Sequence, residues 1–172
     1  MIRKLFVLLI VLLLKTSAFA QISYLDSLQQ ELKTAKDEKK GNILFRIAEI
    51  YRVKENYARA KQESSQLLAL EKKKKSDLLV SKAYTMLSII ELNQENFAEG
   101  KKLNDSLHSV LSRSKEKGAL SYLFYADAYL NYALMNKANL IELTQKSLKL
   151  AEETQDNFLL AKLYSFLFAS NQ

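Results

Sequence analysis

After position 20, apolar side chains recur along most of the chain at steps of three and four residues. This spacing places them on one side of a helix and predicts helices rather than strands. The same apolar pattern recurs at a shift of about 40 residues, and in each copy an asparagine separates two helical stretches. The positions in register include Leu44, Tyr84, Phe124 and Tyr164, and the asparagines are Asn56, Asn96 and Asn136. Each unit is therefore predicted to be a helix, a short turn and a second helix.

The pattern divides the chain into three units over residues 41–75, 81–115 and 121–155, followed by a first helix of a fourth unit that begins near Asn157. Asn tolerates the left-handed backbone conformation that ends helices, so the three repeated asparagines are expected to form the turns inside the hairpins. Residues 21–40 carry one apolar side and are expected to be an N-terminal capping helix, with the repeat domain over residues 41–172. Residues 158–169 are apolar on nearly all sides. They form either a terminal cap or the start of a unit that continues in a longer protein, and their apolar character favours the second alternative.

The spacing of large and small residues in these units resembles the tetratricopeptide repeat. Leu44, Ile47, Ala48 and Tyr51 match the bulky, Leu-like, small and aromatic positions of that family's first helix, and later units match in part. The resemblance implies an all-α solenoid, a right-handed superhelical stack of antiparallel helix hairpins whose first helices line a concave groove. Two departures stand out: the family's period is about 34 residues rather than about 40, and its closing proline is missing.

Composition narrows the class of protein. The 172 residues include 3 Gly, no Pro and no Cys, which disfavours sheet proteins with many turns, phosphate-binding glycine loops and disulfide frameworks. His108 is the only histidine, and its place in the repeat predicts a packing or surface role rather than a catalytic one. We therefore expect no catalytic, metal or cofactor site and no enzyme.

Residues 1–20 have the three-part pattern of a cleavable signal peptide. Arg3 and Lys4 precede an apolar run of ten residues, and the small residues Ala18 and Ala20 mark a cleavage site before Gln21. The apolar run is shorter than the roughly 20 residues of a membrane span. The mature segment is thus expected in the periplasm without a membrane span, with an anchor only in a longer form. Three of the cations behind the net charge of +7 lie in this leader, and no nucleic-acid-binding motif accompanies the rest, so no nucleic acid partner is expected.

One candidate binding surface emerges from the pattern. Four tyrosines share one side of the third unit's first helix: Tyr122, Tyr125, Tyr129 and Tyr132. In the same register, the first helix of the first unit offers Asn42, Phe45, Glu49 and Arg52, and that of the second unit offers Lys82, Thr85, Ile89 and Leu92. Tyrosine suits peptide recognition because it combines a large contact area with a polar group. The alternative is that these rings pack against the next unit, since stripes at helical spacing more often pack than bind.

The resemblance implies a protein or peptide ligand and leaves two functions open. The first is the sensing part of a longer signal-transduction or transcriptional regulator, because exported arrays of this kind often precede a membrane helix and a cytoplasmic output module. The second is a free-standing periplasmic scaffold for envelope or secretion complexes. An apolar run of about 20 residues encoded after Gln172 would favour the regulator, and a stop codon there would favour the scaffold.

Overall fold

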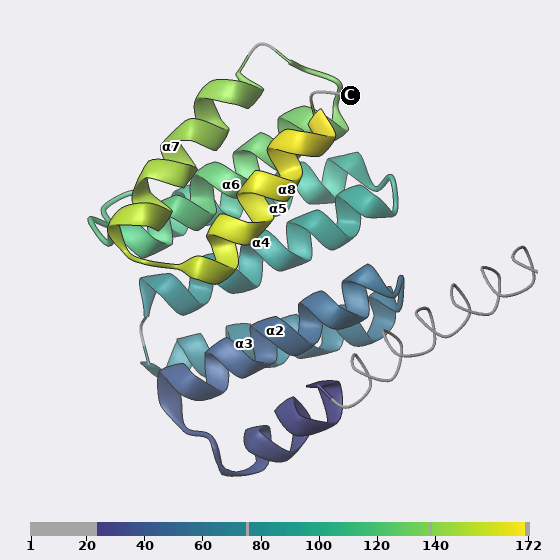
Figure 1. The fold of residues 1–172 in the computed structure, drawn as a ribbon, viewed down its shortest axis with the longest axis vertical. Coiled ribbons are helices and arrows are strands. Elements are labelled where there is room, and N and C mark those ends of the chain that lie inside the picture. Colours follow the sequence, from purple (N-terminus) through teal and green to yellow (C-terminus); the bar gives the residue numbers. More distant parts are fainter. Residues whose placement is uncertain (1–23, 75, 138, 171–172) are drawn as a thin grey trace, which may run out of the picture.

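The computed structural model describes residues 24–74, 76–137 and 139–170 (Figure 1). The expected signal peptide over residues 1–20 lies outside these ranges. A helix over residues 24–34 is followed by α2 (Asp37–Val53), α3 (Tyr57–Lys74), α4 (Asp77–Asn93), α5 (Phe97–Val110), α6 (Lys117–Ala133), α7 (Leu140–Glu153) and α8 (Asn157–Ser170). All regular secondary structure in the described ranges is helical, which confirms the all-α class.

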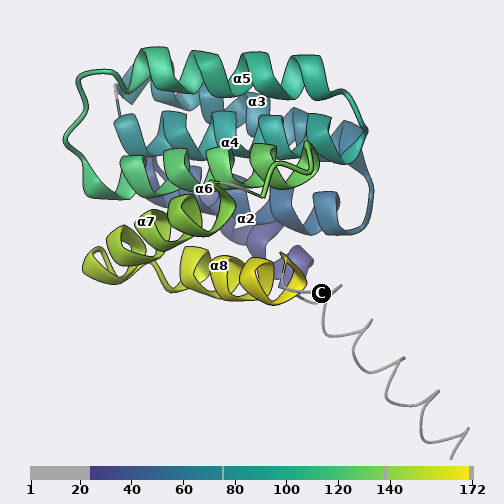
Figure 2. The same cartoon turned by 90° about the horizontal axis from the view of Figure 1, so that it is seen from above.

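Each helix packs on its neighbour in sequence, and α4 and α6 lie at the centre of the fold. Figure 2 shows α5 at one edge with α3 behind it, α4 and α6 in the middle, and α7 and α8 at the opposite edge. Figure 1 agrees, because α7 and α8 lie in front of α6 and α4. The second helices of the first two hairpins, α3 and α5, lie on one side of the fold, whereas α7 lies on the other side (Figure 2). Because the third hairpin (α6 and α7) is turned in this way, α8 passes across the front of α2, α4 and α6 (Figure 1).

The first helices of the three units, α2, α4 and α6, begin four residues before the expected starts of those units. At α2 the first turn is polar, so hydrophobic periodicity does not detect it: the helix starts with two acidic residues, Asp37 and Glu38, which favour a helix N-terminus. At α4, the Ser76 hydroxyl caps the helix by accepting a hydrogen bond from the Leu79 N–H at 3.3 Å. The expected capping helix over residues 21–40 is shorter, since α2 already begins at Asp37. The start of α8 at Asn157 agrees with the expected bound.

The hairpin turns are built by the residue before each asparagine. The left-handed residues are Glu55, Glu95 and Met135, with φ of 56°, 62° and 56°. Each following Asn donates its backbone N–H to the carbonyl five residues earlier, as Asn96 does to Glu91 at 2.9 Å. With the second bond, from Glu95 N–H to the Leu92 carbonyl at 3.1 Å, this is the Schellman arrangement of helix ends. The expectation that asparagine adopts the left-handed conformation is therefore wrong by one residue. Asn56 and Asn96 instead precede the first residue of the next helix, whereas α7 begins four residues after Asn136, at Leu140.

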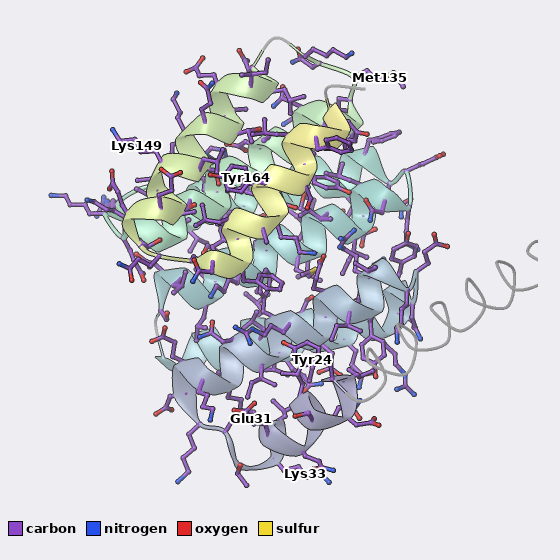
Figure 3. All side chains as sticks on the ribbon, in the orientation of Figure 1. Tyr24, Glu31, Lys33, Met135, Lys149 and Tyr164 are labelled. Atoms are coloured by element: carbon purple, nitrogen blue, oxygen red, sulfur yellow. The ribbon has the colours of Figure 1, made fainter. Side chains whose placement is uncertain are left out.

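Met135 offers a direct test of this turn. Its φ of 56° strains a side chain with a Cβ atom, whereas glycine adopts this conformation freely. The side chain is 88% exposed and contributes little packing (Figure 3). Met135→Gly is therefore expected to raise the free energy of unfolding by about 1 kcal/mol in urea titrations followed by circular dichroism. As a control, Leu134→Gly, at a φ of −86°, is expected to give no gain, and equal effects of the two changes would contradict the assignment.

The helices of a hairpin approach closely where both carry small residues. Ser88 of α4 donates its hydroxyl to the Gly100 carbonyl of α5 at 3.0 Å. In the third hairpin, Ser121 donates to the Ser147 carbonyl and Ser147 returns a bond to the Ser121 carbonyl, each at 2.8 Å. These serine side chains are buried, so the hydrogen bonds satisfy groups that water cannot reach.

Candidate functional site

The tyrosine stripe of α6 faces α8, and much of it is packed. Phe166 of α8 stacks on Tyr129 at 5.5 Å between ring centroids, and it meets Tyr125 and Tyr132 edge-on at 6.0 and 5.3 Å. Offset-stacked and edge-to-face rings at these distances are favourable contacts. Only 7% of Tyr125 is exposed, whereas Tyr132 keeps 44%. While α8 is docked, a ligand can reach only the part of the stripe that α8 leaves open, and binding to the rest requires that α8 be displaced.

Tyr122 is the most deeply buried member of the stripe, with 1% of its surface exposed. Its ring meets Phe45 of α2 edge-on at 5.4 Å, and its hydroxyl donates to Asp156 Oδ2 at 2.9 Å. Burial, followed by the nearby charge of Asp156, raises the pKa of Tyr122 well above its ordinary value. The side chain therefore stays neutral and ties α6 to the turn between α7 and α8.

A charged cluster joins α2 to α8. Arg52 donates to both oxygens of Glu49, from Nε at 2.8 Å and from Nη2 at 2.7 Å, and Lys162 of α8 pairs with Glu49 Oε1. Burial alone would raise the pKa of Glu49, but the hydrogen bonds and charges of Arg52 and Lys162 outweigh it and lower that pKa. Since Glu49 is 6% exposed, this cluster is an internal contact between two helices.

We define the inner face as the surface of α2, α4 and α6 that α8 crosses. It consists of Phe45, Glu49, Arg52, Lys82, Tyr122, Tyr125 and Tyr129. The structure brings together on this face most of the residues that the sequence singled out. What the sequence did not anticipate is that α8 covers the centre of this face with Phe158, Lys162 and Phe166.

Beside the N-terminal end of α8, the inner face opens into a cavity of about 350 Å³. Its walls come from α2, α4, α6 and the α7–α8 turn, and its lining includes Glu38, Asn42, Phe45, Arg46, Lys82, Tyr122, Asp156 and Phe158. Among the residues predicted for the groove, Asn42, Phe45, Lys82 and Tyr122 line this cavity. The repeat register brought Asn42 and Lys82 to the same face, because they occupy the same position in successive units.

Lys82 is the unusual residue of this cavity. It is 6% exposed, and its ammonium donates to Asn42 Oδ1 at 2.7 Å. It also lies over two rings, 5.2 Å from the centroid of Tyr122 and 5.8 Å from that of Phe45. Burial lowers the pKa of Lys82, and the more distant charges of Asp156 and Glu38 oppose this only in part. No carboxylate of the described residues forms an ion pair with it.

The single histidine and the acidic residues form no further site in the part of the chain that the structure describes. His108 Nε2 lies 3.0 Å from both carboxylate oxygens of Asp127, in an exposed contact between α5 and α6. Over the described ranges, no three His, Asp or Glu side chains gather as metal ligands. Within the same ranges, no helix combines the length and the apolar character needed to cross a membrane.

Comparisons of the chain with protein-family models, with curated proteins and with solved structures gave no match. The resemblance to tetratricopeptide repeats therefore stays a prediction from the residues.

Proposed function

We propose that this chain is a non-enzymatic domain that binds a protein or peptide segment on its inner face. The observation that supports this most directly is that the inner face already holds a helix. Phe166 of α8 inserts among Tyr125, Tyr129 and Tyr132, and Lys162 reaches Glu49 on the far side. A partner helix with a basic residue followed four positions later by an aromatic residue could make the same contacts.

The architecture that we propose for α2 to α6 is a tetratricopeptide-like, right-handed stack with a period of about 40 residues, from which α7 and α8 depart (Figure 2). The even spacing of the left-handed turn residues Glu55, Glu95 and Met135 along the chain supports this period. The leader pattern of residues 1–20 supports export to the periplasm. In this proposal the domain is the sensing or interaction part of a longer signal-transduction or transcriptional regulator.

The proposal can be tested by supplying α8 as a separate peptide. The probe is a labelled peptide of residues 157–170 that carries Tyr164→Lys and Phe168→Lys for solubility, because these side chains are 56% and 71% exposed. The receptor is the full-length protein with Phe166→Ala, in which the intramolecular helix competes less well. We expect this receptor to bind the peptide at least about tenfold more tightly than the wild-type protein does, measured by fluorescence anisotropy.

The matched control is the same peptide with Phe166→Ala, which is expected to bind at least about tenfold more weakly. Circular dichroism of the receptor checks that it keeps its helical content. If both peptides bind equally, or if neither binds, the inner face is not a receptor for helical segments and the proposal fails.

A further inference from the structure

Lys82 is a buried lysine that forms no direct ion pair with the described residues. Its ammonium group has three N–H donors, and Asn42 Oδ1 accepts one of them. The ammonium group also lies over the faces of Tyr122 and Phe45. A cation that is 6% exposed and forms no direct ion pair is destabilising, and Asp156 and Glu38 compensate its charge only from a distance. A ligand that supplies an anion would remove this cost.

The cavity around Lys82 carries two cationic donors, Lys82 and Arg46, and two carboxylates, Asp156 and Glu38. The acceptor oxygens of Asp156 are engaged: Oδ2 accepts from Tyr122 at 2.9 Å, and Oδ1 accepts the Leu159 N–H at 3.0 Å. Arg46 lines the cavity from α2, where its guanidinium lies over Phe158 at 5.9 Å and makes no ion pair within the described residues. The first turn of α8 also lies at the cavity wall, with the positive end of its helix dipole.

The charge balance selects the type of anion. Asp156 and Glu38 line the same cavity and repel a doubly charged group such as phosphate. A carboxylate carries one charge, and its two oxygens match donors that approach from two sides, such as Lys82 and Arg46. The rings of Phe45, Tyr122 and Phe158 leave apolar wall for the part of the ligand next to the carboxylate.

We propose that this cavity is a binding site for a carboxylate-bearing ligand, in which Lys82 and Arg46 hold the carboxylate and the three aromatic rings contact the adjoining apolar group. This proposal names a ligand chemistry for the binding function proposed above. It rests on that function only where the ligand is a peptide. The carboxylate belongs either to a peptide, at its C-terminus, or to a free organic acid. A cavity of about 350 Å³ has room for such a group.

The test compares three probes on the full-length protein by NMR titration: 3-phenylpropionate, acetyl-Phe-Ala with a free C-terminus, and acetyl-Phe-Ala amide. We expect one or both of the acids to bind and the amide to bind at least about tenfold more weakly than acetyl-Phe-Ala. Binding of the peptide acid alone identifies a peptide terminus as the source of the carboxylate, and binding of both acids identifies any carboxylate of this shape. Equal affinity of the peptide acid and its amide, or no binding by either acid, would overturn the proposal.

The matched variants are Lys82→Met, which keeps the unbranched shape of the side chain and removes its ammonium group, and Lys101→Met, whose lysine is exposed on α5 and pairs with Asp105 at 2.8 Å. We expect Lys82→Met to weaken binding of the acid probes at least about tenfold while the protein stays folded, since the substitution removes a buried charge that forms no direct ion pair. Lys101→Met is expected to leave the affinity unchanged. Retained binding by Lys82→Met would contradict the site. None of these probes uses Phe166, so failure of the carboxylate site and failure of the helix-binding test can be told apart.

Discussion

Replacing Phe166 with Ala is expected to lower the free energy of unfolding by about 3 kcal/mol or more. The ring is 7% exposed and contacts three tyrosines of α6, so its removal loses apolar burial and leaves a cavity between the helices. The loss is limited by the free energy with which α8 docks, because a detached helix has no further contact to lose. Urea unfolding followed by circular dichroism gives the change.

Phe168→Ala is the matched control, since this residue lies on the same helix and is 71% exposed. Its removal is expected to change the free energy of unfolding by less than about 0.5 kcal/mol. Similar losses for the two variants would mean that α8 does not dock on the tyrosine stripe through Phe166.

Replacing Glu49 with Gln is the second change with a large expected effect. The neutral amide leaves Arg52 and Lys162 without their shared carboxylate in a site where Glu49 is 6% exposed. Removing one member of a buried ion cluster costs about 3–5 kcal/mol. We expect a loss of that size in the free energy of unfolding at neutral pH. Glu142→Gln, which breaks an exposed pair with Lys146, is the control and is expected to cost less than about 0.5 kcal/mol.

The effect of Glu49 also depends on pH in a defined direction. Its pKa in the folded protein is below the ordinary value of 4.5, so the folded state favours the charged carboxylate. The stabilisation is fully present above that ordinary value and is lost as the pH falls through the lower, folded pKa. The difference between the wild-type protein and Glu49→Gln should therefore shrink in acid. A difference that stays constant down to the lowest pH at which the protein folds would refute the charged cluster.

The sequence predicts those parts of the fold that depend on interactions between residues close together in the chain. The helices and the hairpin turns are set by neighbours within a few residues, so the period of Leu44, Tyr84 and Phe124 is enough to place them. The helix starts escape the apolar pattern because they depend on polar groups such as Ser76. The sequence placed the left-handed residue of each turn one position too late, at the asparagine. The residues that adopt this conformation, such as Glu95 and Met135, are not of a type that favours it.

Less of the candidate site than of the fold could be predicted from the sequence. The sequence correctly put the tyrosines of α6 on one side of one helix, but it left open what they face. Their partner is Phe166, which lies on α8, and no local rule connects it to Tyr129. Likewise, the repeat register brought Glu49 and Arg52 into consideration, whereas their pairing with Lys162 depends on how the third hairpin turns.

By itself, the amino-acid sequence determined that this protein is helical and where its hairpins turn, because these properties arise from side-chain periodicity and backbone hydrogen bonds between near neighbours. Only the tertiary structure decided that α8 covers the inner face. It also decided that Lys82 is buried beside Asn42 in the wall of a cavity. Both depend on contacts between helices far apart in the chain. Such contacts follow from packing volume and desolvation of the whole molecule rather than from any one segment.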